Sequence, residues 1–155
     1  MTSRGLVGLD IDGTILLQDE TLSPGVPEAV AEVRDAGYDV MLATGRSWAG
    51  TRRYVEVLDL TAEFTVCSNG AVIMRRVGDE WVRWHVEVFD PAPVLALLRD
   101  RLPEARYMVE LESGQRLYTA VLDDWTLDGG RQVDFDELVS QPVSRVVVVS
   151  PEHDE

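Results

Sequence analysis

Two aspartates stand two positions apart where an apolar segment gives way to a glycine, in the run LVGLDIDGT at residues 6–14. A carboxylate is disfavoured at the end of a buried strand unless a cation, a proton or a substrate compensates its charge, so the pair indicates chemistry. Because residues two apart in an extended chain point the same way, Asp10 and Asp12 can face one substrate atom. The chemistry that this arrangement favours is phosphoryl transfer.

In that chemistry the two acids have different tasks. We expect Asp10 to attack phosphorus and form an aspartyl-phosphate, which splits one difficult displacement into two easier ones. We expect Asp12 to protonate the leaving alkoxide and then to take a proton from the hydrolytic water, a role typically worth roughly 10²–10⁴-fold in rate. Since a phosphomonoester is anionic and repels a carboxylate nucleophile, the reaction also needs a magnesium ion between them.

A calcium-binding loop is the alternative interpretation, because such loops also contain an Asp-x-Asp-Gly pattern. Here the glycine comes too early for that loop, no glutamate stands at its closing position, and an apolar strand precedes the acids. Phosphoryl transfer is therefore favoured over calcium binding.

A second group of candidate residues is the run ATGRS at residues 43–47, again at an expected strand end that opens into a helix. Backbone N–H groups at a helix N-terminus hold anions, the Thr44 hydroxyl can donate to a phosphate oxygen, and Gly45 clears space. Arg46 adds a cation. Taken alone, such a group before a helix is more often simple helix capping, but its place one strand away from the acids favours phosphate binding.

A third group is the run SNGA at residues 68–71, after the next expected strand. An Asn-Gly pair by itself marks a turn. A substrate-binding role for Asn69 and a simple turn both stay open at this point.

The elements that must position these residues alternate between strand and helix over residues 1–68. Apolar runs predict strands at 6–10, 38–43 and 64–67, and helical spacing predicts helices at 26–36 and 48–58. This alternation predicts an α/β fold with a doubly wound parallel sheet, whose ligands bind beyond the carboxyl ends of the strands. Asp10, Thr44 and Ser68 all fall at such ends.

The pattern changes after residue 70. Extended runs at 71–76 and 81–88 predict a β-hairpin, and beyond them a second unit begins with a helix that Asp90 caps and Pro103 stops. Further strands are expected at 106–112, 116–122 and 145–149, with a short helix at 135–139. We therefore expect one domain over residues 1–88 and another over 89–155.

Composition limits the partners. A net charge of −14, from 28 acidic and 14 basic residues, argues against nucleic acid and anionic membranes as partners. No run is long enough for a signal peptide or a membrane span, which favours a cytoplasmic location. With one cysteine, Cys67, and only His85 and His153, no cysteine–histidine zinc site can form, so any metal must be a hard ion held by oxygen.

Together these motifs resemble the phosphatases of the haloacid dehalogenase superfamily, specifically the Cof-like subfamily IIB with an α/β cap. The family's first motif, Asp-x-Asp-Gly-Thr, is matched at residues 10–14, its Ala-Thr-Gly-Arg form of the second motif at 43–46, and the following Ser-Asn-Gly-Ala at 68–71. The resemblance implies a three-layer, Rossmann-like core, here its N-terminal part only, and an incomplete cap over residues 89–155.

The resemblance also implies roles for single residues. Asp10 would be the nucleophile and Asp12 the acid/base, and Mg²⁺ would be held by the carboxylate of Asp10 and the backbone carbonyl of Asp12. The substrate and phosphate-binding residues would be Thr44, Gly45, Arg46 and Asn69. The implied substrates are small phosphomonoesters, with sugar phosphates the commonest in this branch, and a phosphomutase is a close variant.

The chain departs from the family pattern after the cap. Members of this branch return to the core with a lysine that neutralises phosphate and a Gly-Asp-x-x-x-Asp segment that completes the magnesium site, whereas this sequence contains no lysine at all. We therefore expect a truncated chain, with an open apolar edge at residues 6–10 through which it could self-associate. A non-catalytic module that binds phosphate or a partner is the alternative function.

Overall fold

The computed structural model describes residues 4–122, 127 and 129–151. The chain divides into two compact units, Met1–His85 and Val86–Glu155, each of which is described by itself. The division lies close to the boundary expected after residue 88.

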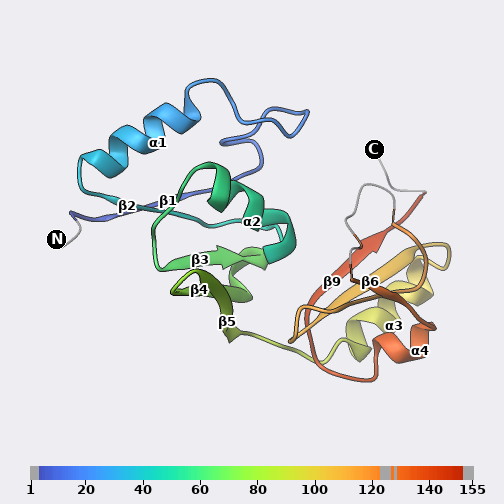
Figure 1. Cartoon of the computed structure of the whole chain (residues 1–155). Helices are drawn as coiled ribbons and strands as arrows, with labels where there is room; N and C mark the ends of the chain where they lie inside the picture. Colours follow the sequence, from blue (N-terminus) through green and yellow to red (C-terminus); the bar gives the residue numbers. More distant parts are fainter. Residues whose placement is uncertain (1–3, 123–126, 128, 152–155) are drawn as a thin grey trace. The chain divides into compact units, whose positions relative to one another are not determined.

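Parallel strands form the centre of the first unit (Figure 1). Strand β1 (Leu6–Leu9) pairs in parallel with β2 (Asp39–Leu42), with Leu6 opposite Asp39 and Leu9 opposite Leu42. Strand β3 (Phe64–Cys67) joins β2 through a parallel bridge between Ala43 and Val66. The carboxyl ends of all three strands therefore meet at one edge, as the alternating pattern predicts.

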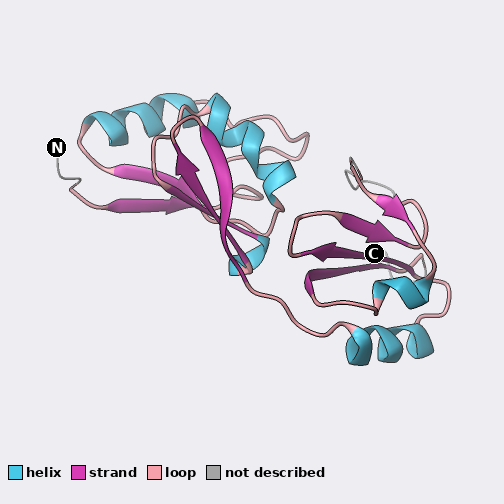
Figure 2. Ribbon diagram, turned by 60° about the horizontal axis from the view of Figure 1, so that its bottom comes forward, coloured by secondary structure: helices cyan, strands magenta, loops and turns pink. Residues whose placement is uncertain are grey.

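Helices α1 (Val26–Asp35) and α2 (Trp48–Val57) pack against one face of this sheet (Figure 2). Every second residue of β2 is buried, so Val40 and Leu42 face the helices. The core cluster that they join draws on both helices and consists of Ile11, Ile15, Leu16, Val30, Val40, Leu42, Tyr54, Val55, Leu58 and Leu60. The helices thereby fix the sheet edge that carries the candidate residues.

Strand β1 lies at an open edge of the sheet. Among the described residues it pairs only with β2. Leu6 is 60% exposed, which is high for a leucine in a strand. The structure thus contains the open apolar edge that the sequence predicts.

After β3 the chain reverses through the short 3₁₀ turn η1 (Ser68–Gly70) into an antiparallel hairpin. Strand β4 (Val72–Val77) runs antiparallel to β3, and β5 (Glu80–Val86) completes the order β3-β4-β5. The hairpin extends the sheet on the side of β3 and leaves the η1 turn beside the strand ends.

The second unit is an antiparallel sheet with two helices. In chain order its elements are α3 (Ala92–Arg101), β6 (Arg106–Leu111), β7 (Arg116–Tyr118), β8 (Arg131–Gln132), α4 (Phe135–Leu138) and β9 (Val143–Val149). The sheet order is β8-β7-β6-β9. Strand β7 is shorter than the expected strand at 116–122, and β8 was not predicted. The core of the second unit consists of Leu95, Tyr107, Val109, Leu117, Leu138 and Val143.

A charged cluster is buried on this second sheet. Glu110 on β6 is 1% exposed and stands opposite Arg116 on β7 and Arg145 on β9. The Nε of Arg116 lies 3.9 Å from the Glu110 carboxylate. Burial lowers the pKa of Arg145, while the charge of Glu110 opposes that shift.

No helix in the described part of the chain has the combination of length and hydropathy that crossing a membrane requires.

Candidate active site

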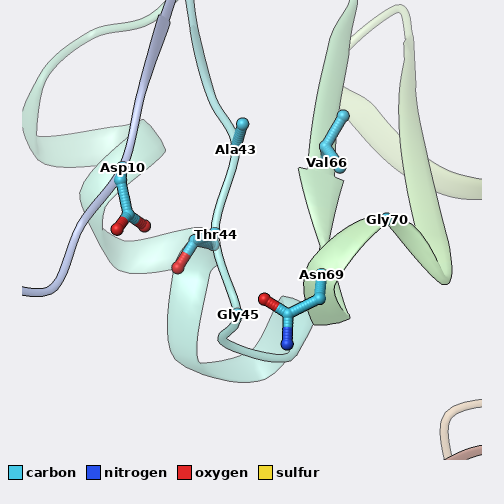
Figure 3. Close-up of a pocket in the computed structure, with 7 residues that line it drawn as sticks. All are labelled: Asp10, Ala43, Thr44, Gly45, Val66, Asn69 and Gly70. Carbon is cyan, nitrogen blue, oxygen red and sulfur yellow. The ribbon is translucent and has the colours of Figure 1, made fainter.

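A pocket of about 460 Å³ opens at the carboxyl ends of β1, β2 and β3 (Figure 3). Its lining residues are Asp10, Ala43, Thr44, Gly45, Val66, Asn69 and Gly70. Each of the three sequence groups singled out above thus contributes to one cavity. This is where ligands of parallel α/β sheets are expected to bind.

Asp10 follows directly after β1, and its side chain is exposed to solvent. Its Oδ1 accepts a hydrogen bond from the backbone N–H of Ile11 at 2.8 Å, which orients the carboxylate. In Figure 3 this carboxylate and the Thr44 hydroxyl point to the same side of the strand ends. An exposed carboxylate at the mouth of a pocket is well placed for nucleophilic attack.

Thr44 is buried, and hydrogen bonds of its backbone N–H and carbonyl hold it in place. Its N–H donates to the carbonyl of Val66 at 3.0 Å, and its carbonyl accepts from the N–H of Asn69 at 3.1 Å. Its hydroxyl oxygen accepts from the N–H of Arg46 at 3.2 Å, before helix α2 begins. The Thr44 hydroxyl can therefore donate a hydrogen bond to an anion in the pocket.

Asn69 is placed in the pocket by an unusual backbone. Ser68 and Asn69 are consecutive non-glycine residues with positive φ, 51° and 55°. Such conformations cost energy and concentrate at functional sites. A Cβ built on Gly45 would lie 3.0 Å from the Asn69 Oδ1, so the glycine makes room for this amide. The turn thus does more than reverse the chain, because it brings an amide to the strand ends.

Asp12 and Arg46 do not line this pocket but pair with each other. The Nε of Arg46 donates to the Asp12 Oδ2 at 2.8 Å, and its Nη2 donates to the Oδ1 at 2.6 Å. The pair is bidentate, although the Asp12 side chain is 57% exposed. Sequence reasoning assigned both residues to the site without predicting this contact.

The ion pair stabilises the ionised form of both Asp12 and Arg46. Hydrogen bonding to Arg46 lowers the pKa of Asp12, and hydrogen bonding to Asp12 raises the pKa of Arg46. A carboxylate held in this way stays ionised, and its lowered pKa makes it a weaker base than an unpaired aspartate. To give a proton to a leaving group, it must first separate from Arg46.

Two further residues complete this network and were missed by sequence analysis. The Glu20 carboxylate accepts from Arg46 at 2.8 Å and from Arg53 at 2.8 Å. The hydrogen bonds from Arg53 and then from Arg46 lower the pKa of Glu20. No motif signalled Glu20, because it lies 26 and 33 positions from these arginines in the sequence.

The donor set is compatible with a magnesium ion. Among the described residues no three His, Cys, Asp or Glu side chains come together as metal ligands. Mg²⁺ commonly takes only one or two carboxylates and fills its shell with water and phosphate oxygens. Asp10, with the backbone of Asp12, could hold such an ion, and this assignment stays a prediction.

Comparison with known proteins gives consistent matches. The profile of the haloacid dehalogenase-like hydrolase family matches residues 7–117. The 5-amino-6-(5-phospho-D-ribitylamino)uracil phosphatase YitU of Bacillus subtilis (strain 168) is 33% identical over 99 residues, covering 64% of this chain and 36% of its own length. Pyridoxal phosphate phosphatase YbhA of Escherichia coli (strain K12) is 34% identical over 99 residues, covering 64% of this chain and 34% of its own length.

The fold also matches solved structures. A haloacid dehalogenase-like hydrolase from Bacteroides thetaiotaomicron superposes with a TM-score of 0.69 at 19% identity, over 96% of this chain and 59% of that one. The match confirms the predicted α/β fold class. The aligned region spans about a third of the length of the two curated relatives.

Proposed function

Because this chain belongs to the haloacid dehalogenase-like hydrolases, we propose that it carries the nucleophile and the phosphate-binding residues of a magnesium-dependent phosphomonoester hydrolase. The observation that carries the proposal is the shared pocket of Asp10, Thr44 and Asn69. Phosphoryl transfer uses a nucleophilic carboxylate together with hydrogen-bond donors such as a hydroxyl and an amide, and all three lie at the carboxyl ends of the strands.

The reaction would proceed in two displacements. An oxygen of Asp10 forms a bond to phosphorus while the bond from phosphorus to the leaving oxygen breaks, and Asp12 gives that oxygen its proton. Water then attacks the aspartyl-phosphate and passes a proton to Asp12, which releases phosphate and restores Asp10. Thr44 and Asn69 donate to the oxygens of the transferred group in both steps.

Magnesium would be held by Asp10 and by the backbone of Asp12, where it would neutralise charge on the phosphoryl oxygens. The chain's own arginines are poorly placed for that task. Arg46 is engaged by two carboxylates, Asp12 and Glu20, and does not line the pocket.

The proposed substrates are small phosphorylated metabolites, with sugar phosphates first among them. The curated relatives are named as phosphatases of a phosphoribityl compound and of pyridoxal phosphate, which are both small phosphomonoesters. The pocket offers few residues that could select among them, because most of its lining is small or belongs to the phosphate-binding turns.

A second candidate function is a module that binds phosphate without turnover. The bidentate pairing of Asp12 with Arg46 favours it, because this pair keeps the proposed acid ionised. The two functions differ in a simple assay.

The test is hydrolysis of p-nitrophenyl phosphate by the 155-residue chain, with and without Mg²⁺, together with binding of inorganic phosphate. We expect magnesium-dependent turnover that Asp10→Asn lowers on the order of 10³-fold or more, since the nucleophile is lost. Asp35→Asn, an exposed acid at the end of α1, is the matched control and should retain activity. Turnover that survives Asp10→Asn would refute the nucleophile assignment, and phosphate binding without turnover would support the second function.

A further inference from the structure

The turn that follows the candidate catalytic acids closes without help from the side chain of Glu20. The N–H of Leu17 donates to the carbonyl of Thr21 at 2.9 Å, and the N–H of Glu20 donates to the carbonyl of Leu17 at 3.1 Å. The Asp19 carboxylate accepts from the N–H and the hydroxyl of Thr21, at 3.1 and 2.6 Å. The Glu20 carboxylate is therefore left to serve another part of the molecule.

The backbone of Glu20 is strained for a residue with a side chain. Its φ is 63°, in the left-handed region that glycine and asparagine adopt more readily. Since the turn itself does not use the carboxylate, the turn does not explain why a glutamate stands there. Strain of this kind at a non-glycine residue indicates that the side chain has a role.

That carboxylate joins two arginines and, through one of them, the proposed acid. One of its oxygens accepts from the Nη2 of Arg46 at 2.8 Å, and the other accepts from the Nη2 of Arg53 at 2.8 Å. The same Nη2 of Arg46 donates to Asp12 at 2.6 Å. An unbroken series of ion pairs thus runs from Arg53 through Glu20 and Arg46 to Asp12.

The buried ring of Tyr54 supports both arginines. The guanidinium carbon of Arg46 lies 5.6 Å from the ring centroid and that of Arg53 lies 4.5 Å from it, within cation–π range. The Tyr54 hydroxyl donates to the backbone carbonyl of Glu20 at 3.4 Å. The ring therefore limits where the arginines can go, and Glu20 and Asp12 both hold the guanidinium of Arg46.

We propose that Glu20 is a positioning residue for Asp12: it fixes the guanidinium of Arg46, which in turn fixes the Asp12 carboxylate next to the phosphate pocket. Arg46 then acts on the proposed acid and not on the phosphate group, a different role from the one its motif suggests. The catalytic consequence rests on the proposed function, whereas the contact itself can be tested without activity.

The first measurement follows the bond between Arg46 and Asp12 by NMR in the ¹⁵N-labelled chain. Solvent exchange of the Arg46 Nε–H, which donates to Asp12, reports how often that bond opens. We expect Glu20→Gln to raise this exchange rate about two- to fivefold, which corresponds to the loss of an exposed ion pair.

Glu56→Gln is the matched control. It removes an ion pair between Arg52 and Glu56 on helix α2, and the Glu56 side chain is 59% exposed where that of Glu20 is 55% exposed. We expect it to change the Nε–H exchange of Arg52 and to leave that of Arg46 unchanged. Backbone amide shifts of β3 in both variants verify that the first unit stays folded.

The second measurement is the kinetics of p-nitrophenyl phosphate hydrolysis. Glu20→Gln should lower kcat by the same two- to fivefold, because a displaced Asp12 carboxylate takes the proton from the attacking water less efficiently, a step in which Asp12 must be ionised. Unchanged Arg46 exchange in Glu20→Gln would overturn the positioning role, as would faster exchange with an unchanged kcat. If the wild-type chain shows no turnover, the proposed function fails, and the Arg46 exchange rate alone decides whether Glu20 positions Asp12.

Discussion

Gly45 stands at the point where the second and third motifs touch, and its lack of a side chain is what lets them meet. A Cβ there would lie 3.0 Å from the Asn69 Oδ1, closer than side chains normally approach. We expect Gly45→Ala to displace the Asn69 amide from the pocket and to weaken binding of inorganic phosphate about three- to tenfold, which is the loss of one hydrogen bond. Isothermal titration calorimetry measures this affinity.

Gly50→Ala is the control for that substitution. Gly50 lies inside helix α2, and a Cβ there meets its nearest atoms at 3.7 Å, an ordinary contact. Phosphate affinity should be unchanged, and the free energy of unfolding should rise by up to about 1 kcal/mol because alanine favours the helix. Equal phosphate affinity in Gly45→Ala and wild type would show that Asn69 contributes nothing to the site.

At this scale the sequence predicts which residues share the pocket but not how charges pair. Asp10, Thr44 and Asn69 could be grouped because each follows a strand, and parallel strands end at one edge. The contact of Arg46 with Asp12 could not, because it joins residues 34 positions apart whose side chains have several available partners. Glu20 carries no local signal apart from lying in a turn.

The elements of the first unit follow closely from local patterns. The expected strand at 64–67 is β3 itself, and Gly37, with φ 90°, lies just beyond the end of α1 as a helix-ending glycine should. The second unit is less predictable. Strand β8 has only two residues and exists because β7 lies beside it, which no periodicity can reveal.

The buried charges of the second sheet depend on strand register. Glu110 is nearly inaccessible between Arg116 and Arg145, which lie opposite it on the two neighbouring strands. Removing the Glu110 carboxylate leaves Arg116 and Arg145 without its negative charge beside them. We therefore expect Glu110→Ala to lower the free energy of unfolding by about 3–5 kcal/mol. Urea denaturation followed by circular dichroism measures this loss.

Glu104→Ala provides the comparison, because it removes the same charge from an exposed loop position of the same unit. A change of at most about 0.5 kcal/mol is expected there. If the two variants prove equally stable, the cluster does not stabilise the second sheet.

At the scale of the whole molecule, we expect the open edge of β1 to be a site for association between chains. Unpaired strand edges with apolar side chains template pairing with another strand. We expect the chain to self-associate at high micromolar concentration, and Leu6→Arg to reduce this association by placing a charge on the edge. Sedimentation velocity over a concentration series measures the change.

Leu97→Arg is the control for charge. Leu97 lies on α3 and is 56% exposed, against 60% for Leu6, so both variants bring the same charge to an equally accessible leucine. Only Leu6→Arg should shift the weight-average mass. A wild-type chain that stays monomeric throughout would exclude the edge as an association surface.

Cys67, the chain's single cysteine, is completely buried at the end of β3. A bulky thiol reagent can therefore modify the native protein only when the first unit opens, and the second unit holds no sulfhydryl to add to the signal. The rate of Cys67 modification therefore reports how often the first unit, which carries Asp10, unfolds. No label has to be introduced to measure it.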